Sequence, residues 1–317
     1  MNVFITSASR KVWLIKAFQD ALKSLKLPGE VLAGDVDPYS ASRFKADGFF
    51  QTVSSSAPRF IDQVSNYCVA KDVKLIVPTR DEELELFAEN KKAFEMLGVY
   101  VMVSHKQVVR LCRDKYCFYR FLSENGFQTP KSYLPSEMLW RSMVFPICVK
   151  SRRGSGGDGF FVAADEREAV FFSNYVRNAF IQEYIQGAEF TADVYISRQK
   201  VVVSVVVRER IKIVAGESFK TRTVDAPDIL EQTVKLVEVL GVEGHVTVQC
   251  MRRGKDIYFL EVNPRFGGAA ALGFEAGAPT PEFLLRELIG CPVERRIDSF
   301  EKGLVMLRYT ADFFLKG

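Results

Sequence analysis

The first hundred residues alternate short β-rich runs with helical patterns, and this alternation restricts the fold more than any other feature of the chain. Strands are expected in five runs: Val3–Thr6, Val31–Gly34, Phe49–Val53, Leu75–Val77 and Val99–Val103. Apolar residues recur at helical spacing over three stretches between them: Arg10–Leu25, Ala57–Lys71 and Asp81–Leu97. Because a helix between two strands lets them lie side by side in the same direction, we expect a parallel α/β sheet.

Two loops of this region follow a strand and open a helix, which is where α/β folds place ligands. The first, Thr6–Arg10, lacks the G-x-G-x-x-G pattern of dinucleotide sites, and its Ser7 and Ser9 either cap the helix or hold a small anion. The second, Pro78–Glu83, either binds a ligand or only sets acidic residues against the helix dipole. The sequence leaves both alternatives open.

The rest of the chain changes character. Between residues 105 and 185, helices alternate with short strands, and from residue 186 onward long β segments dominate. We therefore predict three units, at residues 1–104, 105–185 and 186–317, the first α/β and the other two α+β.

Composition narrows the function. The 317 residues include 43 lysines and arginines against 39 acidic residues, and a net charge of +4 is too small for the basic surface of a nucleic-acid-binding protein. No apolar run approaches the ~18–20 residues that span a bilayer, and the first residues do not form a signal-peptide core. We expect a soluble, cytoplasmic protein that binds neither nucleic acid nor membrane.

The cysteines and histidines exclude several kinds of site. Six cysteines are scattered without a C-x-x-C pair, which favours free buried thiols over a zinc or disulfide scaffold. His105 and His245 are the only histidines, so a histidine metal cluster is excluded and a Ser-His-Asp triad would need one of these two. Carboxylates, amides, lysines and arginines must carry the chemistry.

A glycine-rich loop is the first candidate site. Four glycines at 154, 156, 157 and 159 separate two strands, and Lys150 ends the first of them. Glycines leave backbone N–H groups free to surround an anion such as a phosphate. The pattern differs from G-x-x-x-x-G-K-[ST], so the loop is either a phosphate cover of another kind or a flexible hairpin.

The most informative segment is Phe259–Arg265. Glu261 and Asn263 are two apart on a strand and so face the same side, and Gln249 on the expected antiparallel neighbour faces the same space. Carboxylate and amide oxygens suit Mg²⁺, and Arg265 follows where a guanidinium can neutralise a transferring phosphoryl group. The alternative is a polar pair at a strand end, which is costly at a core rim without a ligand.

In this order the segments resemble the ATP-grasp superfamily, most closely its carbamoyl-phosphate-synthetase large-chain-like and carboxylate–amine ligase members. The resemblance implies a Rossmann-like pre-ATP-grasp domain followed by the two α+β subdomains of an ATP-grasp fold. It also implies that Lys115 and Lys150 contact the phosphates of ATP, with the loop at Gly156 and Gly157 closing as a lid. The residues implied for adenine and ribose are Glu183, Ile185 through its backbone, and Glu189.

The resemblance further implies the reaction. Mg²⁺, or Mn²⁺ in its place, would lie on Gln249, Glu261 and Asn263, with Arg265 as the catalytic cation. ATP would convert a small carboxylate to an acylphosphate, which an amine then attacks. The alternatives are a carbamoyl-phosphate-synthetase-type subunit or partial module, and a non-catalytic nucleotide-binding regulatory protein. The sequence leaves the oligomeric state open, with a homodimer as the one assembly considered.

One cluster of cations exceeds what nucleotide binding requires. Its members lie on two neighbouring β segments: Arg208, Arg210, Lys220 and Arg222. They form either a solvated face or a pocket for an anionic substrate.

Overall fold

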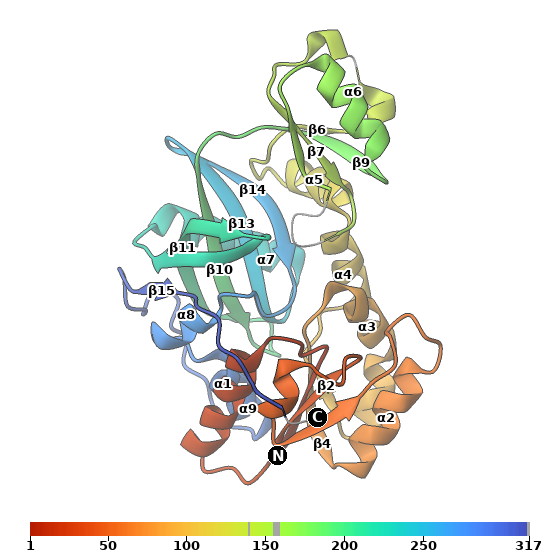
Figure 1. Cartoon of the computed structure of the whole chain (residues 1–317). Helices are drawn as coiled ribbons and strands as arrows, with labels where there is room; N and C mark the ends of the chain where they lie inside the picture. Colours follow the sequence, from red (N-terminus) through yellow and green to blue (C-terminus); the bar gives the residue numbers. More distant parts are fainter. Residues whose placement is uncertain (139, 155–158, 316–317) are drawn as a thin grey trace.

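The predicted parallel sheet is present in the structure, a computed structural model that describes residues 1–138, 140–154 and 159–315 (Figure 1). Its five strands run in the order β3-β2-β1-β4-β5 and pair in parallel. They are β1 (Asn2–Thr6), β2 (Val31–Asp35), β3 (Gly48–Gln51), β4 (Val73–Pro78) and β5 (Tyr100–Val101). Helix α1 (Val12–Ser24) covers one face, and α2 (Phe60–Ala70) and α3 (Asp81–Met96) cover the other.

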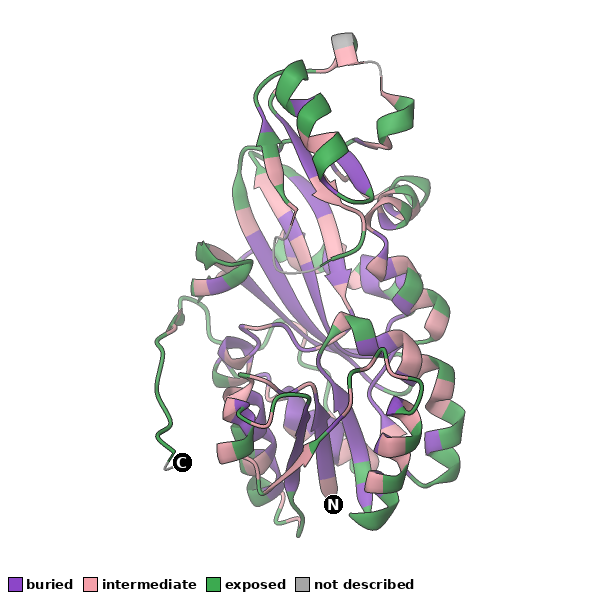
Figure 2. Ribbon diagram, turned by 45° about the vertical axis from the view of Figure 1, so that its right-hand side comes forward, coloured by how far each residue is buried: buried purple, intermediate pink, exposed green. Residues whose placement is uncertain are grey.

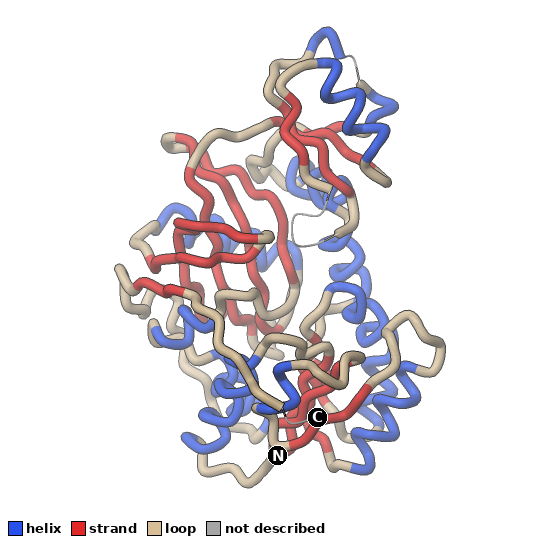
Figure 3. Tube along the Cα trace, in the orientation of Figure 1, coloured by secondary structure: helices blue, strands red, loops and turns tan. Residues whose placement is uncertain are grey.

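The second sheet stands apart from the rest of the molecule, at the top of Figure 1. It is antiparallel, in the order β6-β9-β7-β8, and helix α6 (Glu166–Tyr175) packs on one face. Its strands are β6 (Ser132–Tyr133), β7 (Ile147–Ser151), β8 (Phe161–Ala163) and β9 (Ala179–Glu183). Two helices, α4 (Lys106–Arg113) and α5 (Lys115–Glu124), connect the first sheet to this one (Figure 3).

The third sheet is antiparallel in all its pairings, in the order β14-β13-β10-β11-β12-β15. Its strands are β10 (Ala188–Ile196), β11 (Val202–Val214), β12 (Glu217–Thr223), β13 (Gly244–Arg253), β14 (Asp256–Asn263) and β15 (Val305–Leu307). One face is apolar and packs on α7 (Pro227–Leu240). The other face carries polar side chains, because successive residues of a strand point to opposite sides. The central strands of this third sheet are largely buried (Figure 2).

The C-terminal segment also contributes to the core of the first sheet. Helix α8 (Ala271–Glu275) and helix α9 (Thr280–Leu288) follow β14, and Phe283 and Leu284 of α9 pack in one core with Leu14 and Phe18 of α1. Residues far apart in sequence therefore share the core of the first sheet. Short 3-10 turns complete the chain at Ala41–Phe44, Pro135–Glu137 and Trp140–Ser142. Within the described residues, no helix has both the length and the apolar character needed to cross a membrane.

Candidate functional site

The polar face of the third sheet carries the predicted metal residues. Gln249 of β13 lies directly opposite Glu261 of β14, which confirms the predicted antiparallel pairing. Glu261 and Asn263 point to the same side, and the Asn263 side-chain amide donates a hydrogen bond of 3.0 Å to Glu261 Oε1. The carboxylate is only partly exposed, at 24%. A pair of oxygen-bearing side chains thus faces the space between the second and third sheets.

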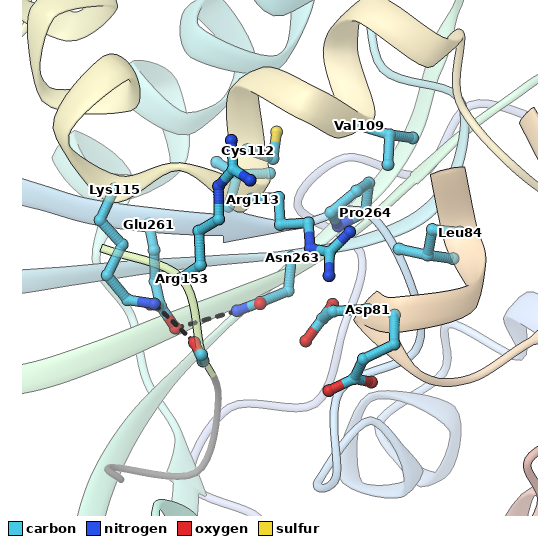
Figure 4. Close-up of a pocket in the computed structure, with 13 residues that line it drawn as sticks. Asp81, Leu84, Val109, Cys112, Arg113, Lys115, Arg153, Glu261, Asn263 and Pro264 are labelled. Atoms are coloured by element: carbon cyan, nitrogen blue, oxygen red, sulfur yellow. Dashed lines mark hydrogen bonds and ion pairs between the residues drawn. The ribbon is translucent and has the colours of Figure 1, made fainter. Parts of the chain in front are cut away.

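A cavity of about 170 Å³ lies beside this pair (Figure 4). Lys115, at the start of α5, points into it, with its ammonium nitrogen 3.7 Å from Glu261 Oε2 and hydrogen-bonded to the Gly154 carbonyl at 2.7 Å. A cavity of this size holds several water molecules. That volume suits small groups such as terminal phosphates or a carboxylate; a whole nucleotide must extend beyond it.

Lys150 approaches the same region from β7 of the second sheet. Its ammonium donates a hydrogen bond of 2.7 Å to Gln182 Oε1 and lies 5.4 Å from the centre of the Phe160 ring. Burial lowers the pKa of Lys150, and the charges of Glu261, Lys115 and Glu189 are close enough to act on it. The structure therefore gathers the two predicted phosphate lysines with Glu261.

The stem of the glycine-rich loop is fixed to the start of α5. Asp114 caps this helix by accepting the N–H groups of Tyr116 and Cys117, and it also accepts two hydrogen bonds from Arg152, at 3.2 and 2.7 Å. The Lys115 N–H donates to the Arg152 carbonyl at 3.0 Å. This network sets Lys115 beside the loop. The predicted lid residues, Gly156 and Gly157, lie outside the described residues.

The residues predicted for adenine and ribose lie at the edge between the two antiparallel sheets. Glu183 ends β9, with its carboxylate 3.7 Å from Arg253, and Ile185 follows as a buried residue. Glu189, near the start of β10, forms an ion pair with Arg210. Arg210 also donates a hydrogen bond of 3.2 Å to the Gln249 side-chain oxygen. Glu189 and Gln249 therefore already share a cationic partner.

The four predicted substrate cations do not gather in one pocket. Arg208 is 3% exposed, and it is paired with Asp193 at 2.7 Å and with the Ser218 hydroxyl at 3.0 Å. Arg222 lies directly opposite Glu209, on the other face of the sheet from Arg208, and bonds it at 2.7 Å. Lys220 is two residues from Arg222 and exposed on that same face. The hairpin register thus separates Arg208 and Arg210 from Lys220 and Arg222.

Arg265 links the third sheet to the first. Its Nε and Nη2 donate to the two carboxylate oxygens of Asp81, at 2.8 and 2.7 Å. Asp81 begins α3, at the carboxyl edge of the parallel sheet, and both side chains are mostly buried. This fork-to-fork pair commits two of the donors that the sequence assigned to the phosphoryl group.

Two residues near this pair escaped the sequence analysis as individual candidates. The Glu83 carboxylate is fully buried and accepts hydrogen bonds from the Thr6 and Ser7 hydroxyls and from the N–H groups of Thr79 and Arg80. Ser7 therefore serves this carboxylate, and neither Ser7 nor Ser9 caps α1, whose first flanking residue is Lys11.

The second of these residues is Arg113, which lines the cavity from the last turn of α4. Its signal in the sequence was only its place two residues before Lys115. Among the described residues, no group of three histidine, cysteine or acidic side chains is arranged to hold a metal ion by itself.

Two sequence relatives are carbamoyl phosphate synthase large chains. The chain is 22% identical to the carbamoyl phosphate synthase large chain of Clostridium beijerinckii, over 59% of this chain and 19% of that protein. It is 29% identical to the protein of the same name from Clostridium botulinum strain Langeland, over 39% and 13% of the two chains. The chain thus matches about a fifth or less of the length of these relatives.

Solved structures share the fold over nearly the whole chain. The biotin carboxylase domain dimer of Hydrogenobacter thermophilus 2-oxoglutarate carboxylase, in complex with MgADP, ADP and bicarbonate, superposes with a TM-score of 0.74 at 16% identity, covering 96% of this chain and 73% of that one. N5-carboxyaminoimidazole synthetase from Staphylococcus aureus, complexed with ADP, gives 0.72 at 16% identity, over 93% and 78%. At this identity the likeness establishes the fold.

Family models agree with both comparisons and with the three-sheet architecture. The model for the PylC-like N-terminal domain matches residues 3–102, which hold the parallel sheet. The model for the ATP-grasp domain matches residues 112–269, from the end of α4 through Arg265. The two matches together span most of the chain, and the chain belongs to the ATP-grasp family.

Proposed function

We propose that this protein is an ATP- and Mg²⁺-dependent ligase that activates a small carboxylate as an acylphosphate for attack by an amine. The observation that carries the proposal is that Lys115, Glu261 and Asn263 line one cavity, enclosed by α3, α4, the start of α5 and the end of β14, and that Lys150 lies close enough for its charge to interact with Glu261 and Lys115. Two cations and a carboxylate–amide pair at one place are what a metal-bound triphosphate requires.

The nucleotide would lie between the second and third sheets. Lys115 and Lys150 bind its phosphates, because both ammonium groups are near Glu261 and burial leaves Lys150 short of water contacts. The adenine and ribose lie along the edge where β9 leads into β10, on Glu183, the Ile185 backbone and Glu189, once Arg210 shares Glu189 with the ribose hydroxyls.

The donor chemistry fits Mg²⁺ bound together with a nucleotide. Glu261 supplies one carboxylate and Asn263 one amide oxygen, and Mg²⁺ commonly takes one or two carboxylates with the remaining positions filled by phosphate and water. The Gln249 side chain lies beside that of Glu261, but its oxygen accepts a hydrogen bond from Arg210. Gln249 can therefore bind the metal ion only when that hydrogen bond breaks. The ion, when bound, neutralises charge that develops on the phosphoryl oxygens.

The chain's own groups would orient the reaction. A carboxylate oxygen of the substrate attacks the terminal phosphorus of ATP, ADP leaves, and the amine then displaces inorganic phosphate from the acylphosphate. Lys115 and Lys150 hold the nucleotide in line. Arg265 follows the cavity-lining Asn263 and Pro264, is held by Asp81, and would serve as the catalytic cation.

The test is ADP release over a panel of amino acids, short carboxylates and amines, including bicarbonate with ammonia. Glu261→Gln keeps the side-chain shape and removes the charge, so turnover should fall by orders of magnitude while ATP affinity falls modestly. Glu209→Gln, on the opposite face of the same sheet, is the matched control and should behave as wild type. Mg²⁺ and Mn²⁺ are compared in the same assay.

Binding gives a second readout. Lys150→Ala removes one charge-assisted contact worth ~1.5–3 kcal/mol, so Mg-ATP affinity should fall roughly tenfold or more in a folded protein. Glu261→Gln turning over at the wild-type rate would contradict the metal assignment. Turnover with bicarbonate and ammonia alone would instead identify a carbamoyl-phosphate-type reaction, and nucleotide binding without any turnover would identify a regulatory protein.

A further inference from the structure

One residue in the wall of the cavity, Arg113, has no role in the proposed function. Opposite Glu261 and Asn263, the cavity is bounded by Asp81 at the start of α3 and by Arg113 in the last turn of α4. Figure 4 shows the Arg113 side chain reaching into the cavity toward the side that Asp81 and Asn263 line. A guanidinium thus lines the cavity on the side opposite the proposed metal residues.

Arg113 has donors to spare. Its one ion pair among the described residues joins Nη1 to Glu85 Oε2 at 3.5 Å, longer than a good hydrogen bond. A guanidinium carries five N–H donors in a planar fork, so most of them remain for a ligand. Arg265, by comparison, has two nitrogens committed to Asp81. Arg153, at the same cavity, is 67% exposed and lies at the solvent side.

The chemistry of the cavity indicates what such a cation would bind. A carboxylate that accepts the terminal phosphoryl group must lie next to that group, hence next to Glu261 and Asn263. Two oxygens of a carboxylate match the guanidinium fork, and pairing with it offsets the repulsion between a carboxylate and a triphosphate. The cavity volume of about 170 Å³ also suits a small acid.

We propose that Arg113 is the residue that binds the carboxylate of the acceptor substrate and so favours acids over uncharged molecules of the same size. This inference rests on the proposed function in one respect, that the bound carboxylate is then phosphorylated. Binding of the acid to Arg113 can be measured whether or not the protein turns over ATP.

The chain offers a matched control one turn earlier on α4. Arg110 is 54% exposed and also pairs with Glu85. Arg110→Gln and Arg113→Gln therefore both remove an arginine partner of Glu85, but only the second changes the cavity. Binding of the standard amino acids and short mono- and dicarboxylates is measured by saturation-transfer NMR in the presence of Mg²⁺ and ADP, and the KM for any acid that supports ADP release is measured in parallel.

In Arg113→Gln, the Kd and KM for the bound acid should rise at least about tenfold, because a charged hydrogen-bonded pair is lost. The Kd for Mg-ATP should stay within about twofold of wild type, and Arg110→Gln should match wild type in both. Arg113→Lys should restore part of the affinity, since it keeps the charge but loses the fork.

Two outcomes overturn the inference: wild-type protein that binds none of the acids, or acid binding that is equally strong in Arg113→Gln. Acid binding that depends on Arg113 in a protein that never releases ADP would instead refute the proposed ligase reaction and leave the binding assignment standing. The two failures are therefore distinguishable.

Discussion

The buried pair of Arg208 and Asp193 provides the sharpest test of how the polar face is built. Arg208 was a candidate substrate residue by sequence, yet the structure surrounds it with protein on all sides. Arg208 and Asp193 are 3% and 2% exposed and lie 2.7 Å apart, and the Thr247 hydroxyl donates to the same carboxylate at 3.1 Å. We predict that Arg208→Met destabilises the fold strongly.

The magnitude follows from what the substitution leaves behind. Methionine fills much of the volume of the arginine stem, so the main effect is a buried carboxylate that has lost its guanidinium partner and keeps the His245 ring, 3.8 Å away, beside it. Breaking a buried pair in this way costs about 3–5 kcal/mol. Since folded proteins are stable by ~5–15 kcal/mol, this loss is a large fraction of the total. At roughly 2–4 °C per kcal/mol, it should lower the melting temperature by about 6–20 °C.

Two further variants isolate the cause. Arg222→Gln removes an exposed arginine that bonds Glu209 at the same distance, 2.7 Å, and should cost at most about 1 kcal/mol. Arg208→Met combined with Asp193→Asn removes both charges and should recover most of the lost stability. Thermal unfolding followed by circular dichroism measures all three. If Arg208→Met has the same melting temperature as Arg222→Gln, the pair of Arg208 and Asp193 does not stabilise the fold.

The pH dependence of this defect has a definite sign. Burial alone would raise the pKa of Asp193, but Arg208 and the neighbouring donors outweigh it and hold the pKa well below the ordinary value. In the wild-type protein, the stabilisation is present above the unfolded pKa of ~3.9 and is lost as the pH falls through the folded pKa. Without Arg208, burial raises that pKa, so the gap in melting temperature should narrow on acidification.

Three other predictions concern the site and its supports. Glu83→Ala leaves four donors without their acceptor, two of them buried, and should cost about 3 kcal/mol in thermal unfolding, whereas Glu83→Gln should cost less, because the Ser7 hydroxyl can turn to accept from the amide. Mg-ATP affinity, measured by titration from pH 7 to 10, should weaken above the lowered pKa of Lys150 by up to about tenfold per pH unit, because phosphates bind the charged form, and Lys150→Met should lack this slope. Asp81→Asn should lower the melting temperature by less than Arg208→Met does, because Asp81 and Arg265 keep some contact with water.

Much of the fold could be predicted because its signals are local. The parallel sheet follows from apolar runs separated by amphipathic helices, and the facing of Glu261 and Gln249 follows from strand alternation in one hairpin. Helix α4 was missed because it has eight residues and a charged, weakly apolar sequence, and α8 and α9 because glycines and prolines surround them. The pairing of β15 with β12 joins residues about eighty positions apart, which no local pattern encodes.

The grouping of the cations required knowledge of register. In sequence, Arg208, Arg210, Lys220 and Arg222 form one cluster, because a hairpin brings the two segments together. Which face each residue takes depends on which residues stand opposite one another, and the β11–β12 pairing is irregular near Lys212. A shift of one residue reverses the face of every side chain on a strand. The structure pairs Arg222 with Glu209. Arg208 and Arg210 therefore lie on the polar face of the sheet, and Lys220 and Arg222 lie on the opposite face.

Arg265 illustrates why the sequence predicted which residues lie at the site but not which residues they form hydrogen bonds with. It lies two residues beyond Asn263, the last residue of β14, so a position close to the predicted metal residues follows from the sequence alone. Its partner, Asp81, is 184 residues away on a helix of another sheet, and only the packing of α3 against the end of β14 brings the two together. With two nitrogens committed there, Arg265 holds the first sheet against the site, and a second guanidinium is needed for a mobile anion. Arg113, with most of its donors uncommitted, meets that need from the same side of the cavity.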